Sequence, residues 1–164
     1  MSVLCAVVAS PPLTSGIRTL NALRLVGELL GVARLEVVNL LDVPTVDVNA
    51  MAVVGAEGGP WHSSRPAIKG GLEASDVWLA AWGMSPLTGP ARGHRRAQID
   101  WVVEQAAAHG HDHVWTVGPE PRHPSRWHQY VCDKHGRTEG VYDFGARLQQ
   151  VLEHQSSQRL SSRR

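Results

Sequence analysis

Apolar positions along the chain fall into short compact runs that alternate with longer, helically spaced segments. Four compact runs predict buried strands, at residues 3–9, 35–41, 76–82 and 113–117. Helices are predicted at residues 17–31, 67–74, 94–109 and 142–154. Strands that alternate with helices favour an α/β fold, a three-layer sandwich with a central, mostly parallel four-stranded sheet.

Proline and glycine predict where the connections lie. Residues 10–16 hold two prolines and a glycine directly after the first strand, which indicates a loop. Residues 55–66 hold three glycines and two prolines and predict a long loop, while residues 46–54 fit either a short helix or irregular structure. Residues 155–164 are polar and basic, so we expect one domain over residues 1–154 followed by a disordered tail.

Composition narrows the class of protein. The 164 residues are 43% hydrophobic and 19% charged, which is typical of a globular domain. The net charge of +1 gives no strong overall field toward nucleic acid or membrane. No apolar run reaches the roughly 20 residues that span a bilayer, and the two cysteines are too few for a disulfide framework. These features predict a cytoplasmic protein without a membrane partner.

The parallel sheet predicts where a ligand would bind. In such sheets ligands bind outside the carboxyl ends of the strands, which here selects the loops at residues 10–16, 42–48, 83–93 and 118–128. The first three offer Pro11 in a rigid turn, Asn39 before the second loop, and Trp82 with Gly83 at the third strand's end. Asn39 would otherwise be a structural amide, and Trp82 a core residue beside a turn glycine.

The densest polar cluster runs from Arg122 to His128. His123 can donate a hydrogen bond to a developing anion, and arginines can bind phosphate. Six tryptophans accompany one phenylalanine, and Trp61 and Trp127 are the candidates for a stacking surface. From this cluster we assign to substrate binding Arg122, Pro124, Ser125, Arg126 and Trp127.

Four short motifs resemble a bacterial and phage family known as domain of unknown function sixteen-forty-three. They are Ser10-Pro11-Pro12, Val37-Val38-Asn39-Leu40, Ala81-Trp82-Gly83 and Arg122-His123-Pro124. Their order and approximate spacing match over residues 3–131. Ser10 stands where the family has asparagine.

That family's layout is similar to the uracil-DNA glycosylase fold, whose late His-Pro-Ser loop is matched by His123-Pro124-Ser125. The resemblance implies that His123 stabilises a departing base and that the first loop, here at Ser10, positions the attacking water. Ser10 is a poor substitute for a carboxylate, so Asp42, or Asp47 from the same neighbouring loop, is the candidate for that role.

Three functions follow from these features. The first is a glycosylase-like enzyme acting on a nucleobase or nucleotide, in DNA or free. The second is a non-catalytic nucleic-acid or nucleotide-binding protein of the same fold. The third is a phage or host accessory protein that binds another protein through Trp61 in the long loop. The chain has no cofactor fingerprint, no paired-cysteine motif and no His-Glu-x-x-His motif, so we expect no cofactor and no metal.

Overall fold

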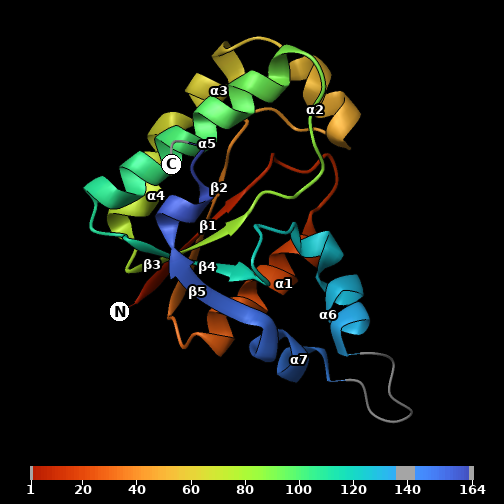
Figure 1. Ribbon diagram of the computed structural model, residues 1–164, viewed down its shortest axis with the longest axis vertical. Coiled ribbons are helices and arrows are strands. Elements are labelled where there is room, and N and C mark those ends of the chain that lie inside the picture. The colour runs from red at the N-terminus through yellow and green to blue at the C-terminus, as the bar shows by residue number, and fades with distance from the viewer. Residues whose placement is uncertain (1, 136–142, 163–164) are drawn as a thin grey trace.

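A computed structural model describes residues 2–135 and 143–162 of the chain. Its five-stranded sheet has the order β2-β1-β3-β4-β5. The strands are β1 (Val3–Val8), β2 (Arg34–Asn39), β3 (Val77–Ala81), β4 (His113–Val117) and β5 (Leu152–Ser156). The first four are parallel and β5 is antiparallel to β4. The arrowheads of β1, β3 and β4 point toward one side of the molecule (Figure 1).

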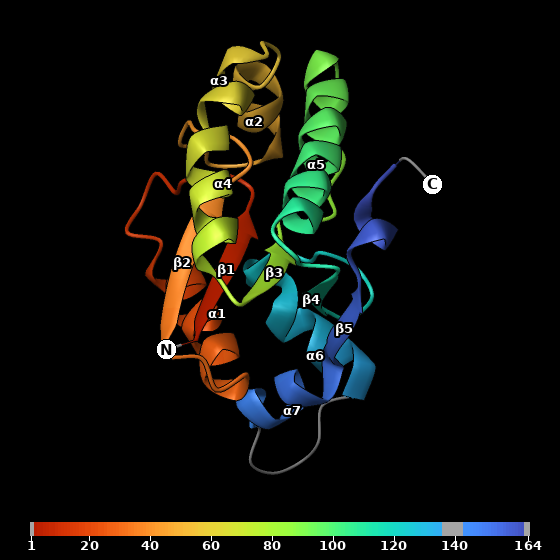
Figure 2. The ribbon, with the colours of Figure 1, turned by 90° about the vertical axis from the view of Figure 1, so that its left-hand side faces the viewer.

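Helices cover both faces of the sheet. One layer contains α2 (Val48–Val54), α3 (Gly59–Ser63), α4 (Arg65–Ala74) and α5 (Pro90–Ala108). The other contains α1 (Ile17–Leu29), α6 (Trp127–His135) and α7 (Phe144–Val151), and the two layers lie on opposite sides of the strands (Figure 2). Two short 3-10 helices, η1 (Pro124–Arg126) and η2 (Ser157–Leu160), complete the described elements. The predicted α/β architecture with a mostly parallel sheet between helices is confirmed, but the prediction of four strands is wrong, because the polar segment β5 adds a fifth strand beside β4.

Strand β1 explains the two layers. All six of its residues are buried, and their side chains alternate between two core clusters. Cys5 and Val7 pack with the α2–α5 layer, whereas Leu4, Ala6 and Val8 pack with the α1, α6 and α7 layer. A strand that is apolar on both faces requires a cover on both faces, and amphipathic helices provide it.

The C-terminal region differs from the prediction. The expected terminal helix ends at Val151, and its last predicted residues begin the fifth strand. Residue 142, where that helix was predicted to begin, lies outside the described residues, as do residues 163–164 of the predicted tail. The prediction of disorder is wrong for residues 155–162, because the buried Gln155 amide donates to Thr116 Oγ1 at 2.7 Å and the Ser162 N–H donates to Asp100 Oδ1 at 2.8 Å. Hydrogen bonds anchor this polar segment without an apolar signal in its sequence.

The prediction of a long loop at residues 55–66 is also wrong. Helices α3 and α4 occupy most of it, each with a proline in its first turn, where the missing N–H costs nothing. Trp61 is buried, with 2% of its surface exposed, and its indole N–H donates to the Gly55 carbonyl at 2.9 Å. Trp61 therefore belongs to the core, and the basis for a protein-binding surface there is removed.

Candidate functional site

A large cavity lies at the carboxyl ends of the parallel strands. Its volume is about 1060 Å³, near the upper end of the roughly 300–1000 Å³ typical of ligand pockets. All four predicted loops contribute to its wall. The predicted site residues that line it are Ser10, Pro11, Asn39, Trp82, Gly83, Arg122, His123, Ser125 and Arg126. Residues from segments far apart in the sequence thus share one cavity.

Three predicted site residues lie outside the cavity wall. Asp42 is exposed, and its backbone N–H donates to the Pro60 carbonyl at 3.2 Å. Pro124 is buried. Trp127 is fully buried, and its indole N–H donates to the Arg122 carbonyl at 2.9 Å. Trp127 therefore packs in the core and holds the loop through this hydrogen bond, and it has no exposed ring face on which a base could stack.

The late loop, residues 118–126, is held against the end of β3. The Gly83 N–H donates to the Pro121 carbonyl at 2.8 Å. Gly83 has a φ of +94°, a backbone conformation that favours glycine, and a Cβ there would be in van der Waals contact with His123 Cβ at 3.4 Å. At the residue of the loop that follows Pro121, the Arg122 guanidinium lies 3.9 Å from the centre of the Tyr130 ring.

The hydrogen bonds of His123 define its protonation state. Its Nδ1 accepts the Ser125 backbone N–H at 3.2 Å and lies 2.9 Å from Ser125 Oγ. Because an amide N–H can only donate, Nδ1 must carry a lone pair, and the neutral ring then bears its proton on Nε2. Burial, followed by the positive charge of Arg126, lowers the pKa of His123 below its ordinary value of 6.5. His123 is thus a neutral N–H donor at the cavity wall.

The cavity wall is positively charged. Arg95, Arg122 and Arg126 line it against one acidic residue, Asp47. None of the three arginines forms an ion pair with a carboxylate among the described residues. A wall with this charge balance favours an anionic ligand.

Arg95 is the arginine with the most restricted geometry. Its guanidinium donates to the Gly83 carbonyl at 2.6 Å and to the Ser85 carbonyl at 2.7 Å, and its Nε is buried without a partner. Desolvation by burial lowers its pKa. In the sequence Arg95 belongs to a basic group, Arg92 to Arg96, that could converge with Arg122 and Arg126 into a phosphate-binding rim. No local pattern shows which member of that group turns toward the cavity.

Three polar side chains complete the wall. Asn39 lines the cavity and its amide has no hydrogen-bond partner in the described part of the chain, which contradicts a structural role for it. Ser10 Oγ lies 2.6 Å from Thr45 Oγ1, so one of these two hydroxyls donates a hydrogen bond to the other. Asp47 Oδ1 accepts the Ala50 N–H at 2.8 Å as the cap of α2.

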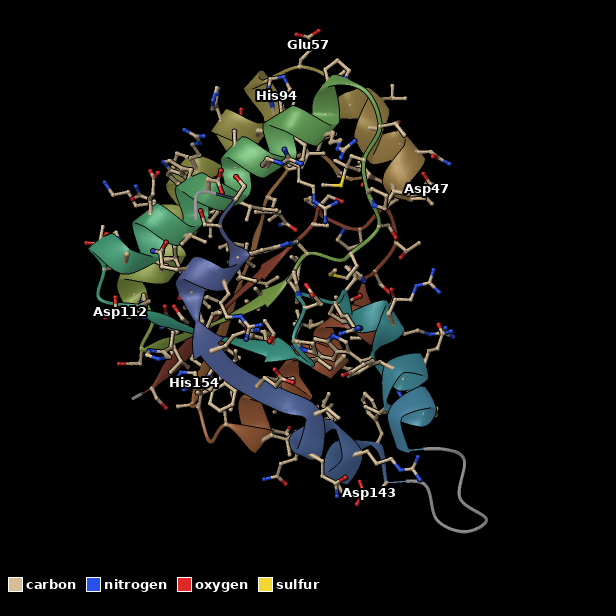
Figure 3. All side chains as sticks on the ribbon, viewed as in Figure 1. Asp47, Glu57, His94, Asp112, Asp143 and His154 are labelled. Carbon is tan, nitrogen blue, oxygen red and sulfur yellow. The ribbon has the colours of Figure 1, made fainter. Side chains whose placement is uncertain are left out.

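Asp47 is the carboxylate that the neighbouring loop brings to the cavity, in place of Asp42. It lies at the start of α2, on the opposite side of the molecule from His154 of β5 in the view of Figure 3. The second carboxylate oxygen, Oδ2, accepts no hydrogen bond from the described residues, and it remains available to a water or a ligand hydroxyl.

The described residues offer neither a cluster of metal ligands nor a membrane-spanning helix. Among the described residues, no group of three or more His, Cys, Asp or Glu side chains could hold a metal ion. No described helix is both long and apolar enough to cross a membrane.

No protein-family model, curated protein or solved structure matches this chain. The fold that is established is therefore the α/β sandwich itself, and the glycosylase-like layout remains a proposal.

A glycine pair tests how tightly the late loop is packed. Gly118 and Gly110 both have positive φ, +73° and +83°. A Cβ at Gly118 would lie 2.5 Å from Tyr130 Oη and 2.8 Å from Arg122 Nη1, whereas nothing lies within 4 Å of one at Gly110. We expect Gly118→Ala to lower the free energy of unfolding by roughly 1–3 kcal/mol more than Gly110→Ala, measured by urea denaturation. Equal losses would contradict the packing described for Tyr130 and Arg122.

The protonation of His123 gives a pH-dependent expectation. Its resonance in a proton NMR titration, assigned with His123→Gln, should have a midpoint below 6.5. Because the unfolded chain takes up this proton at the ordinary pKa, stability from His123 is present above pH 6.5 and is lost as the pH falls toward the folded value. A midpoint at or above 6.5 would contradict the neutral-donor assignment.

Proposed function

We propose that the chain cleaves the N-glycosidic bond of a nucleotide, either free or within DNA. The observation that carries the proposal is the fixed tautomer of His123, a neutral Nε2–H donor that shares one cavity with three arginines and a carboxylate. Each of these groups fits one part of the reaction.

The histidine fits the leaving group. When water attacks C1′ of the sugar, the C–N bond breaks and its electron pair moves onto the base. An N–H donor aimed at a base oxygen stabilises that developing negative charge. A neutral imidazole serves as this donor without the cost of burying a charged ring, and Ser125 keeps it in the required tautomer.

The arginines and Asn39 fit the rest of the ligand. Arg126 is exposed at the cavity mouth, where its side chain can bind phosphate. The amide of Asn39 offers both a donor and an acceptor to the edge of a base, and its present lack of partners leaves both available. Together they select a ligand with a polar base and an anionic backbone.

Asp47 fits the water. Its Oδ2 can accept a hydrogen bond from a water molecule, orient the water oxygen toward C1′ and take the proton that the water loses as the new C–O bond forms, while the α2 cap holds Oδ1 in place. This assigns the water-positioning role to the loop after β2, since the first loop, residues 10–16, has no carboxylate.

Base release tests the enzyme proposal. Oligonucleotides containing uracil and other modified bases, together with the free nucleotides, are incubated with the wild type, His123→Ala and Asp47→Asn. We expect both variants to lose about 10²-fold or more in rate. His154→Gln, which alters a histidine of β5 remote from Asp47 in Figure 3, should retain activity. Absence of release from every substrate, or full activity of His123→Ala, would refute hydrolysis.

A non-catalytic nucleotide- or nucleic-acid-binding protein is the second candidate. It is favoured by the first loop, residues 10–16, which contains no carboxylate that could position an attacking water. This function predicts binding without turnover that weakens as salt is raised. Arg126→Gln should reduce affinity by roughly tenfold, whereas Arg96→Gln, on α5 but outside the cavity wall, should not. Salt-independent absence of binding would contradict this candidate.

A further inference from the structure

A second, smaller cavity adjoins the first across the segment that follows β3. Its volume is about 250 Å³. Trp82, Gly83, Met84 and Arg95 line both cavities. The residues that belong to the second cavity alone are Glu120, Pro121, Arg159 and Leu160. The two cavities are therefore neighbours along the same edge of the sheet, with the Arg95 guanidinium at their common wall.

Arg95 brings a positive charge to this wall that no carboxylate of the described residues neutralises. Its two hydrogen bonds go to neutral carbonyls, and it forms no ion pair with any described acidic residue. A partly desolvated guanidinium without a counter-ion is costly, and a bound anion offsets that cost. Consistent with this environment, burial lowers the pKa of Arg95.

Arg159 adds a second cation from the C-terminal segment. It lies in η2, whose position is fixed at both ends. The Ser157 hydroxyl donates to the His111 carbonyl at 3.1 Å, and the Ser161 hydroxyl lies 3.1 Å from Asp100 Oδ1. The exposed Arg159 side chain forms no ion pair with a described carboxylate, Glu120 of the same cavity included. Two arginines against one glutamate leave the cavity with a net positive charge.

We infer that this second cavity binds a second phosphoryl group of the ligand, between Arg95 and Arg159. The inference rests on the proposed function, because the base and first phosphate would occupy the larger cavity. The second phosphoryl group could belong to a nucleoside diphosphate or to the phosphodiester of a dinucleotide. Either source presents a tetrahedral phosphorus with negatively charged, unbridged oxygens to the two guanidinium groups, and the terminal phosphate of a diphosphate carries more charge than a phosphodiester.

Affinity measurements by calorimetry test for the second phosphate site and distinguish a nucleoside diphosphate from a dinucleotide as its ligand. The five deoxynucleoside 5′-monophosphates of A, C, G, T and U are titrated first. The best base is then tested as its 5′-diphosphate and as a 5′-phosphorylated dinucleotide, with the wild type, Arg159→Gln, Glu120→Gln and Arg96→Gln. Arg96 lies outside both cavity walls and serves as the matched arginine control. Melting temperatures verify that each variant is folded.

At least one ligand with two phosphoryl groups should bind the wild type roughly tenfold more tightly than the monophosphate. Arg159→Gln should remove that advantage and leave the monophosphate affinity unchanged. Glu120→Gln should increase the advantage by removing a negative charge, and Arg96→Gln should have no effect. A gain for the diphosphate alone or for the dinucleotide alone identifies the source of the second phosphoryl group.

Two results would overturn the inference, and they differ in what else they overturn. If a monophosphate binds but Arg159→Gln affects all ligands equally or not at all, the second phosphate site is refuted and the proposed function stands. If no nucleotide binds the wild type in any form, both the second site and the proposed function fail.

Discussion

Burial of β1 on both faces is the constraint on which the rest of the structure depends. The strand is paired in parallel with β2 on one side and with β3 on the other, and its six side chains are buried. Two parallel neighbouring strands are joined by a crossover connection that runs back over one face of the sheet. Here helices in these connections cover both faces and form the two layers. Parallel pairing also brings the carboxyl ends of the strands to one edge (Figure 1), which is where the main cavity lies.

Buried polar groups then fix the helices and loops around that edge. The Gln98 amide donates to the carbonyls of Leu40 and Trp61, which anchors α5 to the end of β2 and to α3. On the other side of the sheet, the Trp127 indole N–H holds the Arg122 carbonyl. Because unsatisfied buried polar groups are costly, these bonds select one arrangement of the loops from many that apolar packing alone would allow.

Hydrogen bonds within the protein also decide which polar groups the cavity offers to a ligand. Ser10 and Thr45 share a hydrogen bond, and Asp47 caps a helix with one oxygen. Within the described residues, the Asn39 amide forms no hydrogen bond and the three arginines of the wall form no ion pair, so these groups are available to a ligand in the cavity. His123 is the intermediate case, because Ser125 occupies one ring nitrogen and leaves the other as a donor. A ligand can therefore interact with the polar groups of the cavity wall that lack a hydrogen-bond or ion-pair partner among the described residues.

The sequence by itself determined the layers, the four parallel strands and the loops that meet at the cavity, because apolar periodicity and proline–glycine breaks are local signals. Tertiary structure decided the remainder. It placed Trp61 and Trp127 in the core and Asp47, rather than Asp42, at the cavity. It also made a strand of a polar segment through the hydrogen bonds of Gln155. Burial of a tryptophan, the direction of a carboxylate and the pairing of an edge strand all depend on partners distant in sequence, so no local pattern records them.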